Sequence, residues 1–162
     1  MTHVIRFPET PVGRLFIRED NGWNFFALAS GDVEVPPEAY LRLDLGPWRA
    51  GVPGSADLCL AALKRLQPFD LQELNLQRLG KYGPRGSYVT DESLSFIQHL
   101  EGLNELVLRT TAVTGRGLLH LRSLSSLRRI DLSHSDIDDV GLAGLTLFPD
   151  LEELSLNNTH IT

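Results

Sequence analysis

Two histidines and an aspartate near the C-terminal end of the sequence have the side chains best suited to hold a metal ion. His134 lies two residues before Asp136, and the interval from Asp136 to His160 is one that recurs in this part of the chain. Imidazole and carboxylate groups are frequent ligands of divalent transition metals. The same positions fall between regular segments, where turns favour His, Asp and Asn for conformational reasons. We therefore predict no metal ligands and keep a metal site at this C-terminal rim as the weaker alternative.

No other group of residues points to catalysis or to a cofactor. The single cysteine, Cys59, has no partner for a disulfide or for a thiolate metal site. It lies between Leu58 and Leu60, which favours a buried apolar role over that of a nucleophile. The segment Gly-Pro-Arg-Gly at residues 83–86 lacks the Lys-Ser/Thr pair of a phosphate-binding loop. The sequence predicts a protein that is not an enzyme and that carries no cofactor.

The composition is that of an ordinary globular chain. Its 162 residues, 42% hydrophobic and 22% charged, suit one domain or one domain with a small appendage. The net charge of −6 argues against nucleic-acid binding, which favours a basic surface. No apolar run approaches a membrane span, and the first residues lack the layout of a signal peptide. We expect a cytoplasmic protein that binds neither a membrane nor nucleic acid.

The elements that must position the polar residues repeat at a constant interval between Leu103 and Thr162. Within one repeat, Leu154 and Leu156 alternate with polar residues, which predicts a strand with one buried face. Later in the repeat, apolar residues spaced by three or four positions after a glycine predict a helical turn. The matching strand positions are Leu103, Leu127 and Leu151; Leu106, Ile130 and Leu154; and Leu108, Leu132 and Leu156. The period falls within the range of about 20 to 50 residues that is typical of a stacked solenoid.

Three polar residues stand just before the predicted helical segments, at Thr90, Thr114 and Asp138. Side-chain oxygens at this position accept hydrogen bonds from the first free N–H groups of a helix. We therefore expect these residues to act as N-caps.

The order L-x-x-L-x-L, then T/S-x-V/I, then G-L-x-x-L resembles the leucine-rich repeat over roughly the last 100 residues. It is most similar to the bacterial type, and to the cysteine-containing subclass of F-box-associated proteins and the ribonuclease-inhibitor-like subclass. The resemblance implies an α/β fold: a right-handed solenoid with a parallel β-sheet on the concave face and short helices on the convex face. Leu106, Ile130 and Leu154 should then form one interior column.

Residues 1–40 have a different pattern, in which short runs of β-branched and aromatic residues are separated by Pro and Gly. This pattern predicts strands and turns. We predict a β-rich N-terminal cap over residues 1–40 and a solenoid over residues 41–162, whose first strand begins near Tyr40. Trp23, Phe25 and Phe26 are expected to pack inside the cap, with a ligand pocket as the alternative.

The first full repeat is longer than the others. The interval from Leu71 to Leu103 exceeds the one from Leu103 to Leu127, and the excess falls around residues 78–87, with the core positions back in frame afterwards. An insertion that leaves the frame intact should form a loop at the rim. This loop carries Arg78, Lys81 and Arg85 without an acidic residue, and loops on rigid scaffolds often take part in recognition.

The side chains between the buried leucines should point out of the sheet and form ladders across successive strands. They are mainly polar, which suits the recognition of a folded protein or a polar segment. The predicted partner-binding residues are Glu73, Glu105, Arg129 and Glu153; Asn75, Val107, Asp131 and Ser155; and Gln77, Arg109, Ser133 and Asn157.

We therefore expect a non-catalytic protein-protein interaction scaffold whose partner binds the concave face. The alternative is a substrate-recognition adaptor of a larger enzyme complex, although no F-box-like helical segment precedes the repeats. The sequence ends within a repeat, after its last strand around Leu154 and Leu156. Two expectations follow: either the repeats continue in a longer solenoid, or another subunit covers the open strand edge and forms a homodimer through this strand.

Overall fold

The structure is a computed structural model that describes residues 2–46, 56–77 and 89–162. The predicted rim loop, with Arg78, Lys81 and Arg85, lies outside the described residues.

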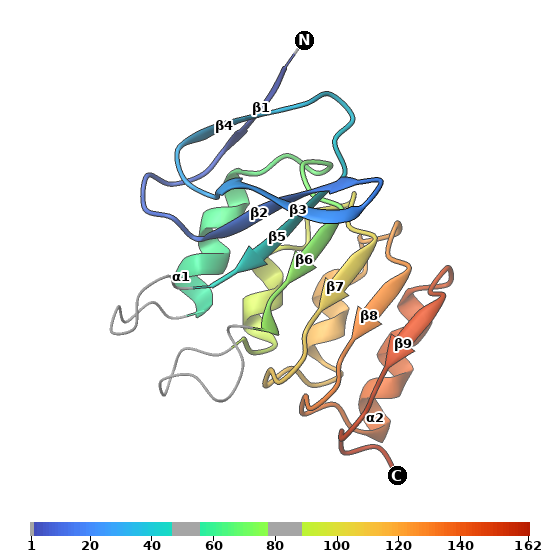
Figure 1. Cartoon of the computed structure of the whole chain (residues 1–162). Coiled ribbons are helices and arrows are strands. Elements are labelled where there is room, and N and C mark those ends of the chain that lie inside the picture. The colour runs from blue at the N-terminus through green and yellow to red at the C-terminus, as the bar shows by residue number, and fades with distance from the viewer. Residues whose placement is uncertain (1, 47–55, 78–88) are drawn as a thin grey trace.

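A seven-stranded sheet runs through the whole molecule (Figure 1). From β5 to β9 all neighbouring strands are parallel, whereas β2 is antiparallel to both β3 and β5. The strands follow in the order β3 (Gly22–Leu28), β2 (Gly13–Glu19), β5 (Leu41–Leu45), β6 (Glu73–Asn75), β7 (Glu105–Val107), β8 (Arg129–Asp131) and β9 (Glu153–Ser155). The parallel part confirms the repeat architecture expected from the sequence period, and it joins directly to the N-terminal strands.

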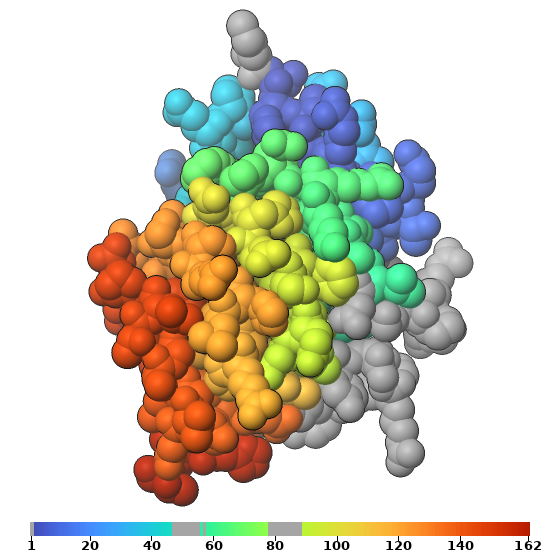
Figure 2. All heavy atoms as spheres, turned by 180° about the vertical axis from the view of Figure 1, so that it is seen from behind, coloured from blue at the N-terminus to red at the C-terminus, as the bar shows by residue number. Residues whose placement is uncertain are grey.

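Two further strands, β1 (His3–Arg6) and β4 (Asp32–Val35), form a separate antiparallel pair. Short helices connect the parallel strands and lie behind the sheet in Figure 1. They are α1 (Ala56–Ala61), η1 (Ala62–Arg65), η3 (Glu92–Phe96), η4 (Gly117–Leu121), α2 (Asp139–Leu142) and η5 (Ala143–Leu147). Seen from behind, the connections form adjacent bands that cover this side (Figure 2). None of the described helices has both the length and the apolar character needed to span a bilayer.

The core lies between the sheet and its connections. Leu106 and Ile130 are buried and in register, as the period predicts, and Leu154 continues their column on β9. Leu154 is nevertheless 38% exposed, because β9 is the outer strand of the described sheet. The column is therefore confirmed, with its last member open to solvent.

The residues before the helical turns differ in how they contact the backbone. The carboxylate of Asp138 accepts a hydrogen bond from the Gly141 N–H at 2.9 Å, which is a typical N-cap. Thr90 was expected to cap in the same way, but this prediction is wrong. Its hydroxyl donates to the Glu92 carboxylate instead, because the acidic residue two positions on offers a stronger acceptor.

Candidate interaction face of the sheet

Two rows of side chains cross all seven strands on the side of the sheet away from the core; together they are called the sheet face below. Backbone register places the first row in the order Phe25, Phe16, Arg42, Glu73, Glu105, Arg129 and Glu153. The second row is Leu28, Arg14, Asp44, Asn75, Val107, Asp131 and Ser155. The residues between them, such as Leu43 and Leu106, are buried in the core, as strand alternation requires. The predicted ladders are in register, but they also extend onto β5, β2 and β3, which the sequence did not reveal.

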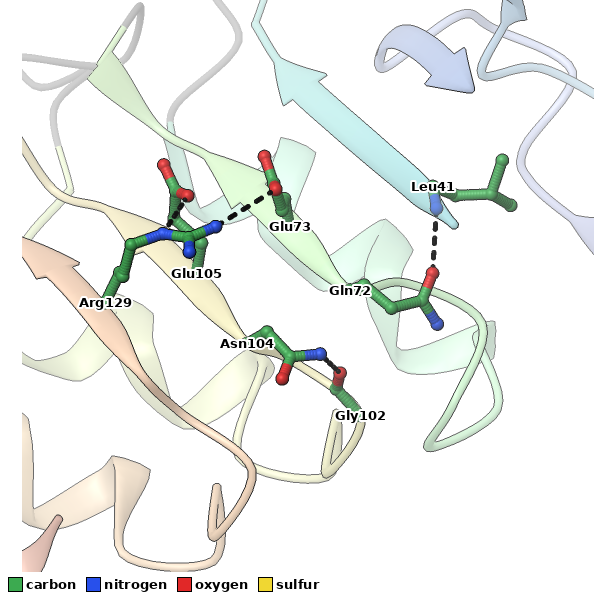
Figure 3. A network of polar contacts seen from close by, with 7 residues as sticks. All are labelled: Leu41, Gln72, Glu73, Gly102, Asn104, Glu105 and Arg129. Carbon is green, nitrogen blue, oxygen red and sulfur yellow. Dashed lines mark hydrogen bonds and ion pairs between the residues drawn. The ribbon is translucent and has the colours of Figure 1, made fainter. Parts of the chain in front are cut away.

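A network of one arginine and two glutamates occupies the middle of the first row (Figure 3). Nε of Arg129 donates to Oε2 of Glu105 at 2.8 Å, and its Nη2 lies 3.6 Å from Oε1 of Glu73. The sequence placed Arg129 next to Glu105 and Glu153 along this ladder, and register confirms this order. The guanidinium pairs with Glu105, as expected, and it also reaches across β7 to the more distant Glu73, because the long arginine side chain spans two strands.

Glu73 is the least exposed charged group of the network, since the residue is only 5% exposed. Burial raises the pKa of its carboxyl above the ordinary value of 4.5, and the nearby Glu105 raises it further. Arg129, Arg42 and Arg18 act in the opposite direction without cancelling the rise. Burial and then Glu73 likewise raise the pKa of the Tyr40 hydroxyl. Ionisation of the Glu73 carboxyl in the centre of the sheet face is therefore less favourable than in the unfolded chain.

Aromatic and arginine side chains form a second cluster on the N-terminal strands. The Arg42 guanidinium lies 4.7 Å from the ring centre of Phe16 and 4.9 Å from that of Trp23. Arg18 lies 5.5 Å from the same Trp23 ring, and Tyr40 packs against it at 5.9 Å between ring centres. These distances are those of cation–π contacts and of paired rings.

The sequence prediction for the aromatic residues of β3 is only partly right. Phe26 packs against the core, as expected. Phe25 is 57% exposed on the sheet face, and Trp23 is half-buried beside it. The reason is that β3 has core on one side only, so alternate residues face solvent. The alternation in Phe16-Ile17-Arg18 and Arg42-Leu43-Asp44 was the signal that could have located this cluster.

One predicted partner-binding residue does not reach the surface. Ser133 is fully buried, so it cannot contact a partner. The Asp131 carboxylate accepts the Ser133 N–H at 2.9 Å, which turns the chain inward just after the strand. Asn75 binds the Gln77 N–H at 3.0 Å in the same manner, but Gln77 remains exposed. Of the remaining members of this third ladder, Arg109 is partly exposed and Asn157 is exposed.

The C-terminal rim offers no metal site in the described part of the chain, where no three His, Cys, Asp or Glu side chains come together suitably. The ring Nε2 of His134 instead lies 3.3 Å from the Asn158 side-chain amide of the next repeat. Cys59 is half-buried, and burial raises the pKa of its thiol, so the unreactive protonated form dominates at neutral pH.

A cavity of about 270 Å³ lies where the N-terminal strands meet the loop before β6. It is lined by His3, Tyr40, Phe69 and Asp70, among others. Nε2 of His3 lies 2.7 Å from Oδ1 of the buried Asp70, whose other oxygen accepts the Gln67 N–H at 2.7 Å. His3 and Asp70 are thus already paired with each other, and their contact ties β1 to the first repeat.

One curated relative of the chain is named as a leucine-rich-repeat-containing protein. No family model matches the chain. Leucine-rich repeat-containing protein 42 of Danio rerio is 26% identical over 179 aligned residues, which cover 98% of this chain. The chain spans only 40% of the length of that curated relative. Among solved structures, internalin C2 from Listeria monocytogenes is 29% identical, with a TM-score of 0.46, over 64% of this chain and 38% of its own.

Proposed function

Because the chain is a leucine-rich-repeat protein, we propose that it is a non-catalytic scaffold that binds another protein on the sheet face. Proteins built from stacked repeats commonly use the extended sheet surface in this way. The partner lies across the open, concave side of the repeats, and the helical connections serve as the rigid backing.

The observation that carries this proposal is the continuity of the two rows across the seven strands. Their side chains include arginines, carboxylates, the Asn75 amide and the exposed ring of Phe25 on one surface. Arginine and aromatic residues are the types that contribute most to protein-protein binding. The backing side carries scattered apolar residues such as Leu119 and Val140, and scattered residues of this kind are normal on a monomer surface.

The Arg129 network supports recognition by charge. Arg129 is held in place by Glu105 and Glu73, so its ordering is complete before a partner arrives. Ordering side chains in advance lowers the entropic cost of association. A partner with both positive and negative side chains opposite this region could pair with the ordered Arg129 and its two glutamates. This pairing would set the orientation of the partner.

The test is affinity purification of partners with the intact chain and with two variants that change one residue each. Val107→Arg places a large charged group in the middle of the sheet face. Val140→Arg, the matched control, makes the same change on the helical side, where Val140 is 82% exposed. We expect Val107→Arg to lose the partner and Val140→Arg to retain it, with thermal unfolding used to verify that both variants fold. Equal recovery by the two variants would exclude the sheet face as the binding surface.

A second copy of the chain is a proposed additional partner, pairing through β9. Leu154 is exposed there, and β9 pairs only with β8 among the described strands. Light scattering tests this proposal, since a mass that stays monomeric with rising concentration would contradict it.

A further inference from the structure

The outer edge of β3 is a second feature of the sheet that is suited to binding, and it lies apart from the repeats. β3 pairs only with β2 among the described strands, and none of its seven residues is buried. Between Gly22 and Leu28 it contains neither a charged residue nor a proline. Edge strands are usually protected by such residues, because their free N–H and C=O groups pair readily with another strand.

Hydrogen bonding on β2 shows which backbone groups of β3 face outward. The Arg18 N–H donates to the Tyr40 carbonyl at 2.9 Å, so the backbone polar groups of Arg18 point toward β5. Trp23 lies opposite Arg18, and this pair is therefore a non-hydrogen-bonded one. The N–H and C=O of Trp23 consequently point to the free edge. The same holds for Phe25, which lies opposite Phe16 two residues along the ladder.

A positively charged side chain lies near this edge of β3. Arg18 extends from β2 over the Trp23 ring, which brings its guanidinium above β3. Within the part of the chain that the structure describes, no carboxylate forms an ion pair with Arg18, whereas Arg42 pairs with Asp44 at 3.1 Å. Stacking on an aromatic ring orders a guanidinium and leaves its N–H groups available at the edge. Beside it, Phe25 offers an exposed apolar ring.

We propose that the edge of β3 binds an extended segment of a partner protein, with an acidic residue opposite Trp23 and an apolar residue opposite Phe25. An added strand would lie about 4.8 Å from β3, which brings a carboxylate opposite Trp23 within reach of Arg18. These two positions are two residues apart and point to the same face. The segment binds at Gly22–Phe25, because Phe26 has no partner on β2 and its bulge interrupts regular pairing further along.

The chemistry of the edge favours this occupant over a second copy of β3. Two β3 strands would satisfy the free backbone groups, but β3 has no acidic residue to pair with Arg18. The edge adjoins the end of the sheet face that carries Phe25, and it lies three strands away from β6, where the repeat ladders begin. Binding of a strand to this edge and binding of a partner to the repeat ladders can therefore be measured separately.

The experiment selects strand-length random peptides, displayed on phage, on the intact chain. We expect enriched peptides to carry Asp or Glu two positions from an apolar residue. Arg18→Glu should weaken the best peptide by at least about tenfold in fluorescence anisotropy, because it replaces an attraction by a repulsion. Phe25→Pro removes one outward N–H that the fold does not use, so it should abolish peptide binding. Phe25→Ala keeps this N–H and should bind the peptide more tightly than Phe25→Pro does.

Amide exchange measured by NMR gives a direct readout of the edge. Bound peptide should slow exchange at the Trp23 and Phe25 amides. The proposal is overturned if no peptide is enriched, if enriched peptides lack the acidic residue, or if Phe25→Pro binds as well as Phe25→Ala. Protection of the same two amides in the protein alone, increasing with concentration, would instead assign the edge to a second copy.

Discussion

The carboxylate of Asp91 accepts two hydrogen bonds from Thr114 of the next repeat, one from the backbone N–H at 2.7 Å and one from the hydroxyl at 2.6 Å. Asp139 binds Thr162 in the same way, at 3.1 and 2.9 Å. These contacts join neighbouring repeats on the side of the turns. Since the stability of stacked repeats depends on contacts between neighbours, these hydrogen bonds should contribute to it.

Thr114→Val is therefore expected to destabilise the protein. The variant keeps the shape of the side chain but removes two hydrogen bonds, one to the Asp91 carboxylate and a longer one from the Arg116 N–H at 3.3 Å, at a cost of about 1–3 kcal/mol. Urea unfolding measures the loss. Thr90→Val is the matched control, because the Thr90 hydroxyl bonds only exposed or local groups; a change of less than about 0.5 kcal/mol is expected there. Equal losses in the two variants would contradict the proposed role of the Asp91 contact.

Gly115→Ala should destabilise the protein more than the addition of a single methyl group suggests. Gly115 stands at the position of its repeat that matches Asp91 in the preceding one, and its backbone touches that of Gly141. An added Cβ would lie 1.8 Å from the Gly141 Cα, so the two repeats would have to separate. We expect a loss of about 1–3 kcal/mol or more in thermal or urea unfolding. Gly144→Ala is the comparison, since its nearest contact would be at 3.2 Å and its loss should be smaller.

Arg129→Ala should destabilise the sheet by leaving Glu73 and Glu105 adjacent without a shared cation. The loss is expected at about 1–3 kcal/mol, because a largely buried carboxylate loses its partner. Adding Glu105→Gln should recover part of it, and a double-mutant cycle measures the coupling. Arg128→Ala, which breaks the exposed pair with Asp150, should cost no more than about 1 kcal/mol. A larger loss for Arg128→Ala than for Arg129→Ala would reverse our ranking of the two pairs.

Glu73 predicts a particular dependence of stability on pH. Its folded-state pKa is raised, so the folded protein binds a proton that the unfolded chain has already released as pH increases. The Glu73 contribution is thus most favourable below the unfolded value near 4.5 and is lost as pH rises through the folded value. Compared with Glu73→Gln, the wild type should become relatively less stable between acidic and neutral pH. Urea unfolding of both proteins across this range checks the sign, and a rising relative stability of the wild type would be inconsistent with it.

The parallel part of the fold was predictable because its cause is local and repeated. Buried leucines that recur at one constant interval fix the strand register, and Glu73, Glu105, Arg129 and Glu153 then follow in order. Ser133 was mispredicted since the turn that buries it depends on a single hydrogen bond from its own backbone to Asp131. The position of Ser133 within the repeat does not by itself reveal this hydrogen bond.

The extension of the sheet face onto the N-terminal strands was not predictable in the same way. β2 and β3 pair antiparallel to the rest, and no period links Phe16 or Trp23 to the leucine positions. Their exposure depends on which strand adjoins β5, which is a long-range property of the chain. The reach of Arg129 to Glu73 across an intervening strand is likewise a matter of side-chain conformation rather than of sequence spacing.

β5 is the one strand of the described sheet that has an antiparallel neighbour on one side and a parallel neighbour on the other. The place at which a further repeat could be added to the sheet therefore matters. A duplicated repeat inserted between β7 and β8 would meet the same geometry above and below it, and would lengthen the surface by one strand. The same module inserted between β2 and β5 would have to pair antiparallel with β2, as β5 does now, so its two neighbours would differ. Duplicating a repeat within the parallel part would therefore lengthen the sheet while β2 and β3 keep their neighbours.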